Sequence, residues 1–113
     1  MPYINFKTRK KVKLWEGVYG QLYHSEALTF AHVTLLQGAV VNEHSHIHEQ
    51  WTHIIEGELL FNLNGEEKLL TAGMAAFMPS NVPHSATAVT ECKVIDCFQP
   101  VRKDFIELEK QTL

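Results

Sequence analysis

Three histidines and a glutamine alternate in one short segment, and this pattern constrains the chain more than any other feature. In residues 43–50, single residues separate His44, His46, His48 and Gln50. In an extended strand, residues two apart point to the same face. Several imidazoles that point to one place suit a transition metal. The segment therefore predicts a β-strand protein with a metal centre.

The composition is that of one small globular domain. The chain has 113 residues, 45% of them hydrophobic, and a formal net charge of −3. No apolar run is long enough to span a bilayer and no apolar signal core follows Met1, so we expect a cytoplasmic protein with no membrane partner. The negative charge argues against a nucleic-acid partner. Two cysteines, Cys92 and Cys97, are too few for a disulfide scaffold, and we expect both to be reduced.

Short β-type segments separated by turn residues recur along the chain. Asn64-Gly65 is the clearest hairpin turn, because both central positions of that turn need a positive φ. Residues 79–83 form a second turn before a strand, and residues 104–113 either form a short helix or lie against the barrel. The expected strands lie near residues 3–6, 12–15, 18–24, 28–36, 43–46, 50–56, 58–63, 66–70, 74–78, 84–90 and 92–98.

Many short strands of this kind indicate a sandwich or a jelly-roll barrel, whose interior can hold a small ligand. Several strands have apolar residues on both faces, as in Ile54-Ile55 and residues 75–78, and this favours a homodimer. A basic cluster near the N-terminus has two interpretations, a solvated edge that discourages aggregation or a docking site for an acidic partner. Its members are Lys7, Arg9, Lys10, Lys11 and Lys13.

The histidines belong to a longer pattern of fixed spacing. After Gly38 come five residues, then His44 and His46, three residues, Gln50, six residues and Gly57. A second pattern runs through residues 73–88, in the order Gly73, five residues, Pro79, one residue, Asn81, two residues, His84, three residues and Ala88.

Together the two patterns resemble the two motifs of the cupin superfamily, at residues 38–57 and 73–88. The resemblance implies an all-β fold, the cupin double-stranded β-helix or jelly-roll barrel, as a single domain over residues 1–113. Three positions depart from the family pattern. Gln50 stands in place of Glu, Asn81 in place of Gly and Ala88 in place of Asn. The second change is mild because Asn tolerates the left-handed backbone region.

The resemblance also implies a divalent transition metal, with Ni, Fe, Mn and Zn as the candidates. For Gln50 the alternative is a hydrogen bond to a water on the metal. His48 falls in the bend after His46 and is expected to line the pocket. His53 lies three residues from Gln50, so in a strand it is expected to face the side opposite to Gln50. The implied ligands are His44, His46, Gln50 and His84.

The amide of Gln50 has a chemical consequence. Three neutral imidazoles and a neutral amide leave the full charge of the metal uncompensated, whereas a carboxylate would cancel part of it. We therefore expect a stronger Lewis acid and a less accessible higher oxidation state. This favours polarisation of a substrate oxygen over redox chemistry at the metal.

The segment after the second motif supplies further candidate site residues. In a strand over residues 92–98, Asp96 and Phe98 share a face, Pro100 ends the strand, and Arg102 can reach over the barrel mouth. A carboxylate near a metal can move protons, and an arginine can clamp a carboxylate. The alternatives are a buried Asp96 bonded to backbone and a surface ion pair of Arg102 with Asp104 or Glu107.

The whole chain resembles the small single-domain cupins of the pectin-degradation KdgF type. The resemblance rests on residues 44–50, Asn81–His84 and the tail Asp96–Phe105. It implies an enzyme that converts 4,5-unsaturated monouronates to linear ketonised sugars, with a small carboxylated sugar as its substrate. It implies Asp96, Phe98 and Arg102 as the residues that line the active site. The rival hypotheses are an Fe(II)-dependent cupin dioxygenase and a non-catalytic sugar-binding or sensing cupin.

Overall fold

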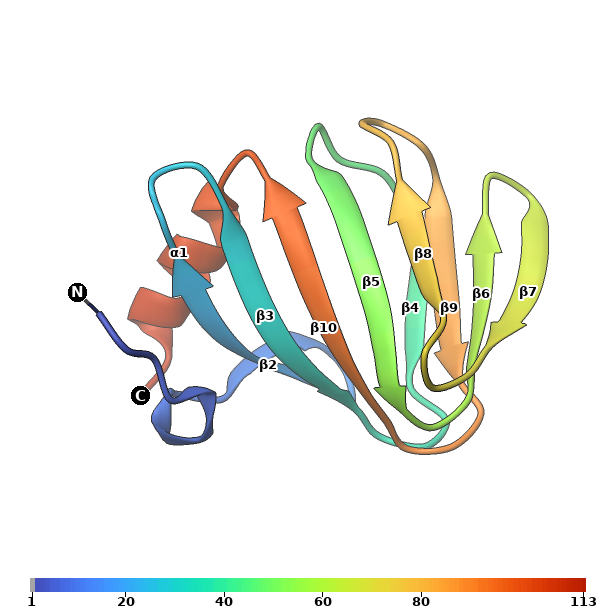
Figure 1. Cartoon of the computed structure of the whole chain (residues 1–113), viewed down its shortest axis with the longest axis horizontal. Helices are drawn as coiled ribbons and strands as arrows, with labels where there is room; N and C mark the ends of the chain where they lie inside the picture. Colours follow the sequence, from blue (N-terminus) through green and yellow to red (C-terminus); the bar gives the residue numbers. More distant parts are fainter. Residues whose placement is uncertain (1) are drawn as a thin grey trace.

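The computed structural model describes residues 2–113, which form a single domain of two antiparallel sheets and a short C-terminal helix (Figure 1). The predicted all-β class is confirmed. Among the described residues, no helix is long and apolar enough to cross a membrane. The elements are the 3₁₀ turn η1 (Phe6–Thr8), β1 (Val12–Trp15), β2 (Val18–His24), β3 (Thr29–Leu35), β4 (Val40–His44), β5 (Glu49–Glu56), β6 (Leu59–Leu63), β7 (Glu66–Leu70), β8 (Ala75–Met78), β9 (His84–Ala88), β10 (Cys92–Gln99) and α1 (Lys103–Gln111).

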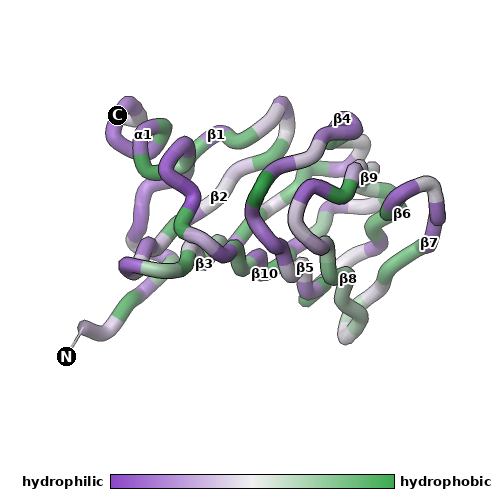
Figure 2. Tube along the Cα trace, turned by 90° about the horizontal axis from the view of Figure 1, so that it is seen from above, coloured by the Kyte–Doolittle hydropathy of each residue, from purple (hydrophilic) through white to green (hydrophobic). Residues whose placement is uncertain are grey.

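The two sheets face each other and enclose the core. The larger sheet has the strand order β1-β2-β3-β10-β5-β8, and the smaller has the order β4-β9-β6-β7. Figures 1 and 2 show α1 at one end of the molecule and β7 at the other. Burial alternates along the strands, so that β3 turns Thr29, Ala31, Val33 and Leu35 inward. This alternation is what a sheet with one face on the core requires.

Asparagine supports two of the tight turns. Asn64 (φ 51°) and Gly65 (φ 88°) form the predicted hairpin turn between β6 and β7. The Gly65 N–H donates to the Asn62 side-chain oxygen at 2.9 Å. Asn81 takes φ 66° in the turn before β9, as expected for an asparagine at a position that favours glycine.

Two of the predicted strands are corrected by the structure. Residues 3–6 form no strand, because the Asn5 side chain accepts the Lys7 N–H at 3.0 Å and starts the 3₁₀ turn η1 instead. The strand predicted over 43–46 ends at His44. The chain then bends toward the turn before β9, where the Asn81 N–H donates to the His46 carbonyl at 2.8 Å.

Residues 103–111 form the helix α1, the first of the two arrangements considered for this segment, and two members of the basic cluster tie it to the N-terminal segment. The Lys10 ammonium donates to the carbonyl oxygens of Glu109 (3.3 Å) and Thr112 (3.0 Å) at the C-terminal end of α1. A cation there compensates the unpaired carbonyls of the helix end. Arg9 pairs with the Glu109 carboxylate at 3.4 Å and also donates to the Leu22 carbonyl. These two residues therefore help to hold α1 against the N-terminal segment.

The two cysteines lie on β10 and are both free, as predicted. Cys92 is buried and Cys97 is half-buried. Their odd spacing places Cys92 on the core side of the larger sheet and Cys97 on its outer side.

Candidate metal centre

A cavity of about 340 Å³ lies between the sheets and carries the candidate site. Its wall is mostly apolar, with a polar group of side chains from both sheets and from the tail that leads into α1. The helix contributes Phe105 and Leu108 to the lining. The polar lining residues are His44, Gln50, Thr52, His84, Ser85, Asp96, Arg102 and Asp104.

Three of the four predicted ligands form one cluster that can hold a metal ion. One ligand atom from each of His44, His46 and His84 lies within 4.8 Å of the other two. His44 ends β4 and His84 begins β9, and the two residues are direct partners in the ladder. His46 reaches the same place from the bend after β4, where the strand period no longer applies.

Each of these imidazoles is oriented by a carbonyl oxygen two residues away in the chain. The Nδ1 atoms of the three rings lie 2.8–3.0 Å from those oxygens, which belong to Asn42, His48 and Val82. Because a carbonyl oxygen only accepts, each Nδ1 carries the proton and each Nε2 keeps its lone pair. The His84 Nε2 is buried and has no hydrogen-bond partner among the described residues. These unpaired lone pairs fit a metal cation.

Burial keeps the His46 and His84 rings in the form that binds metals. It lowers the pKa of His46 to about 4, and the nearby charge of Arg102 acts in the same direction. Burial also lowers the pKa of His84. A metal ligand has to be a neutral imidazole. At neutral pH these two rings are therefore ready to bind a cation without first losing a proton.

Gln50 lies beside the histidine cluster, and its amide has a defined orientation. Its NH₂ donates to the Thr52 hydroxyl at 2.9 Å, which turns its oxygen to within 3.0 Å of the His46 Nε2. Since the only proton of the neutral His46 ring is on Nδ1, two lone pairs face each other across this distance. A cation near both atoms removes that repulsion, so the donor set fits a metal here.

Asp96 lies next to this amide on the inner face of β10. Its Oδ1 is buried without a hydrogen-bond partner among the described residues. Burial raises the pKa of Asp96 to about 6, while the neighbouring polar side chains of Thr52 and Gln50 and the charge of Arg102 limit the rise. An amide at position 50 can donate to this carboxylate, whereas a glutamate would repel it.

Arg102 covers the cavity from the tail and is only 8% exposed. Its Nε and Nη2 donate to the two carboxylate oxygens of Asp104 at 3.0 and 2.8 Å. Its guanidinium carbon lies 3.9 Å from the centre of the Phe105 ring and 4.8 Å from that of Phe98. The ion pair with Asp104 considered from the sequence is present, but it lies at the cavity and leaves Nη1 without a protein partner among the described residues.

A family model for the cupin domain matches residues 31–98, which is more than half of the chain. The chain belongs to the cupin family. This cupin is 32% identical to the pectin degradation protein KdgF of Dickeya dadantii (strain 3937) over 84 residues, which cover 73% of this chain and 76% of that protein. The predicted membership and the likeness to KdgF are thus confirmed.

Solved structures agree with this assignment. An RmlC-like cupin from Shewanella frigidimarina NCIMB 400 has a TM-score of 0.86 and 31% identity, with 91% of this cupin and 94% of that chain covered. KdgF from a Halomonas species has a TM-score of 0.83 and 29% identity, with 91% and 96% covered. The cupin fold therefore extends over nearly the whole chain.

The remaining histidines of the opening segment and its neighbourhood lie outside the cluster of this cupin. His48 is not part of the three-histidine group, and its backbone carbonyl serves instead to orient the His46 ring. His53 lies on β5 at an odd step from the buried Gln50, which places it on the outer face as predicted.

Some residues of the site were missed from the sequence. Thr52 orients Gln50, and the period of two along β5 was the available signal, because both residues are buried on one face. Trp15 packs its ring 5.1 Å from the His44 ring, and Phe105 lies under Arg102. Only the folded arrangement of distant segments brings Trp15 to the site, whereas Phe105 belongs to the tail that also carries Arg102.

Divalent metal should stabilise this cupin through the three histidines. After treatment with a chelator, addition of Ni²⁺, Mn²⁺, Zn²⁺ or Fe²⁺ should raise the unfolding temperature by several degrees, since a ligand at 100 times its Kd adds about 2.7 kcal/mol. His84→Ala and His46→Ala should abolish the shift, which differential scanning calorimetry measures. His53→Ala on the outer face is the control and should retain it. A shift that persists in both cluster variants would contradict the assignment.

Proposed function

We propose that this cupin is a metal-dependent isomerase that converts 4,5-unsaturated monouronates to linear ketonised sugars. The observation that carries the proposal is one cavity in which a buried carboxyl group, Asp96, and a guanidinium, Arg102, adjoin the histidine cluster. Support for a sugar acid as the substrate class comes from the likeness to KdgF, whose name links it to pectin degradation.

The substrate would bind through its carboxylate at Arg102. Arg102 is one of the residues of the cavity wall, and its Nη1 makes no hydrogen bond to the described part of the chain. The bidentate pair with Asp104 holds the guanidinium in one plane, which pre-organises it for a carboxylate. Phe98 and Phe105 supply an apolar wall for the sugar ring. The volume of about 340 Å³ is within the range of small-molecule pockets.

Asp96 would move the proton. In the reaction, the C1 hydroxyl loses its proton and the C1–ring-oxygen bond breaks, so that C1 becomes an aldehyde. The released ring oxygen becomes the C5 ketone, and C4 gains a proton, so the product is an isomer of the substrate. A carboxyl group with a pKa raised to about 6 can accept the first proton and return one to C4 near neutral pH.

The residues that would hold the metal are His44, His46, His84 and Gln50. A divalent ion bound there supplies Lewis-acid polarisation of a substrate oxygen. All four donors are neutral, which supports this role over redox chemistry. Thr52 holds the Gln50 amide with its oxygen toward the histidines.

Replacement of Asp96 should remove turnover and leave substrate recognition. We expect Asp96→Asn to lower kcat by about 10²–10⁴-fold, because it cannot transfer the proton. Arg102→Lys should raise KM, because an ammonium group cannot pair with both oxygens of Asp104 and at the same time present a fixed donor to the substrate carboxylate. The ultraviolet absorbance of the unsaturated monouronate measures both. The metal-induced thermal shift, measured in parallel, checks that Asp96→Asn keeps the metal site.

Other outcomes of this assay decide against the proposal. Oxygen uptake with Fe²⁺ would identify the dioxygenase alternative. Thermal stabilisation by the sugar acid without loss of absorbance would identify the sugar-binding alternative. Activity of Asp96→Ala equal to that of the wild type would rule out the proton-transfer role of this residue.

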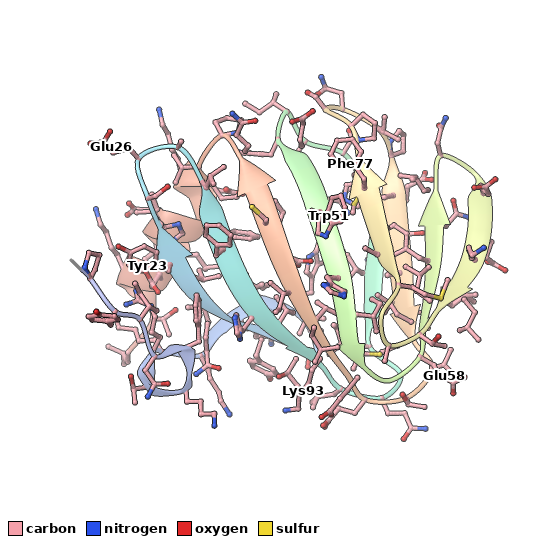
Figure 3. All side chains as sticks on the ribbon, in the orientation of Figure 1. Tyr23, Glu26, Trp51, Glu58, Phe77 and Lys93 are labelled. Atoms are coloured by element: carbon pink, nitrogen blue, oxygen red, sulfur yellow. The ribbon has the colours of Figure 1, made fainter. Side chains whose placement is uncertain are left out.

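We also propose that the partner of this cupin is a second copy of itself, bound at the outer face of the larger sheet. Trp51 and Phe77, 51% and 45% exposed, are neighbours on β5 and β8 (Figure 3). A two-fold interface brings the residues near its axis close to their own copies, so charges at its centre would repel. Two cross-strand rows of this face have no Asp, Glu, Lys or Arg. The first row consists of Tyr23, Phe30, Cys97, Trp51 and Phe77. The second row consists of Gln21, His32, Ile95, His53 and Ala75.

A carboxylate at the centre of this face should separate the two copies. We expect the wild type to be a dimer at micromolar concentrations and Trp51→Glu to be a monomer, as measured by sedimentation equilibrium. Leu69→Glu is the matched control, because Leu69 is 42% exposed on the other sheet. A wild type that stays monomeric at 100 μM (roughly ten times a typical weak dimer Kd), or a Leu69→Glu variant that dissociates equally, would refute the proposed interface.

A further inference from the structure

A chain of buried and partly buried hydrogen bonds and ion-pair contacts connects the backbone of Arg102 to α1 and the N-terminal segment, and Thr29 is at its centre. Thr29 begins β3 and has no exposed surface. It is the direct ladder partner of His24 on one side and of Phe98 on the other. Thr29 is thus next to a residue of the proposed active site without being part of the metal cluster.

The groups around the Thr29 hydroxyl set the direction of its two hydrogen bonds. The backbone N–H of Arg102 can only donate, so the Thr29 hydroxyl oxygen accepts it at 2.9 Å. The same hydroxyl lies 2.8 Å from the His24 Nδ1, and we assign the hydroxyl as the donor because the Glu109 carboxylate faces the other ring nitrogen. His24 then carries its proton on Nε2, which makes no hydrogen bond to the described residues and faces the Glu109 carboxylate at 3.7 Å. The opposite tautomer would place a lone pair against that carboxylate.

The far end of the chain is held by the N-terminal segment. Glu109 on α1 also pairs with Arg9, at 3.4 Å. Arg9 in turn donates to a carbonyl of β2. The connection therefore runs from Arg9 through Glu109, His24 and Thr29 to the residue that precedes α1.

The hydroxyl of Thr29 serves a purpose that packing alone does not require. The other inward residues of β3 are Ala31, Val33 and Leu35, so an apolar side chain of the same shape would suit this strand. A valine would fill the space but would leave the Arg102 N–H and the His24 Nδ1 without partners. The polar group is thus explained by Arg102 and His24.

We propose that Thr29, oriented by His24, is a positioning residue that fixes Arg102 for its contact with the substrate carboxylate. The guanidinium is held at its far end by Asp104 and Phe105, and the hydrogen bond that the Arg102 N–H donates to Thr29 holds the other end of the residue. With both ends fixed, the guanidinium keeps one position at the cavity. The role of the carboxylate rests on the proposed function, whereas the hydrogen-bond chain does not.

The first test addresses the hydrogen-bond chain itself and needs no substrate. Long-range ¹H–¹⁵N spectra of the full chain should show His24 protonated on Nε2, and the Arg102 amide should exchange slowly with solvent. In Thr29→Val the amide should exchange at least tenfold faster, and Thr29→Ser should restore slow exchange. A His24 ring protonated on Nδ1, or an unchanged Arg102 amide in Thr29→Val, would overturn the inference.

The second test addresses the positioning role with the unsaturated monouronate. Since Arg102 contacts the carboxylate in the ground state and in the transition state, Thr29→Val should raise KM about tenfold with kcat within a factor of two. Thr29→Ser should restore KM. Val12→Ala, a core change outside the cavity wall, is the control for reduced stability and should leave KM unchanged.

The two failures can be told apart. If the wild type turns over the sugar and Thr29→Val keeps its KM, the positioning role is refuted and the proposed function stands. If the wild type does not turn over the unsaturated monouronate, the proposed function fails. The ¹H–¹⁵N spectra and the amide exchange rates then still decide whether Thr29 fixes Arg102.

Discussion

The amide of Gln50 is the interaction on which the rest of the site depends. Its oxygen faces the lone pair of the His46 Nε2 at 3.0 Å, and its NH₂ group donates to Thr52 at 2.9 Å. The oxygen of this amide thus faces the proposed cation position beside His46, and its NH₂ group faces Thr52 on the other side. A glutamate at position 50 would repel the Asp96 carboxylate. An apolar side chain there would remove one donor for the cation and leave the Thr52 hydroxyl without the hydrogen bond from Gln50. The choice of glutamine therefore follows from the presence of the acid next to it.

The two sheets make this arrangement possible because each supplies one part of it. The ladder of the smaller sheet sets His44 beside His84, and the larger sheet places Gln50, Thr52 and Asp96 on neighbouring inner positions of β5 and β10. Strand pairing fixes these side chains with little freedom, so the site is organised before any ligand binds. The helix α1 is different, since long-range contacts with the N-terminal segment hold it over the cavity.

Local sequence patterns predicted much of the fold. Features that depend on contacts between distant segments were predicted less well. The turn at Asn64-Gly65 and most strands follow from turn chemistry and period. The strand expected at residues 3–6 was wrong because the Asn5 side chain competes for the backbone locally. The end of β4 was misplaced because the Asn81 N–H, far along the chain, draws the His46 carbonyl into a bend. Motif spacing brought out the histidines, but Thr52 and Thr29 act through partners that no spacing reveals.

The central claim is that the site performs metal-dependent isomerisation without oxygen. Its most direct test is the loss of ultraviolet absorbance of an unsaturated monouronate, measured with metal-loaded protein in air and under strict exclusion of oxygen. We predict equal rates under the two conditions and loss of activity after chelation, reversed by added metal. A rate that requires oxygen, or an absorbance that the metal-loaded protein does not change, would contradict the claim.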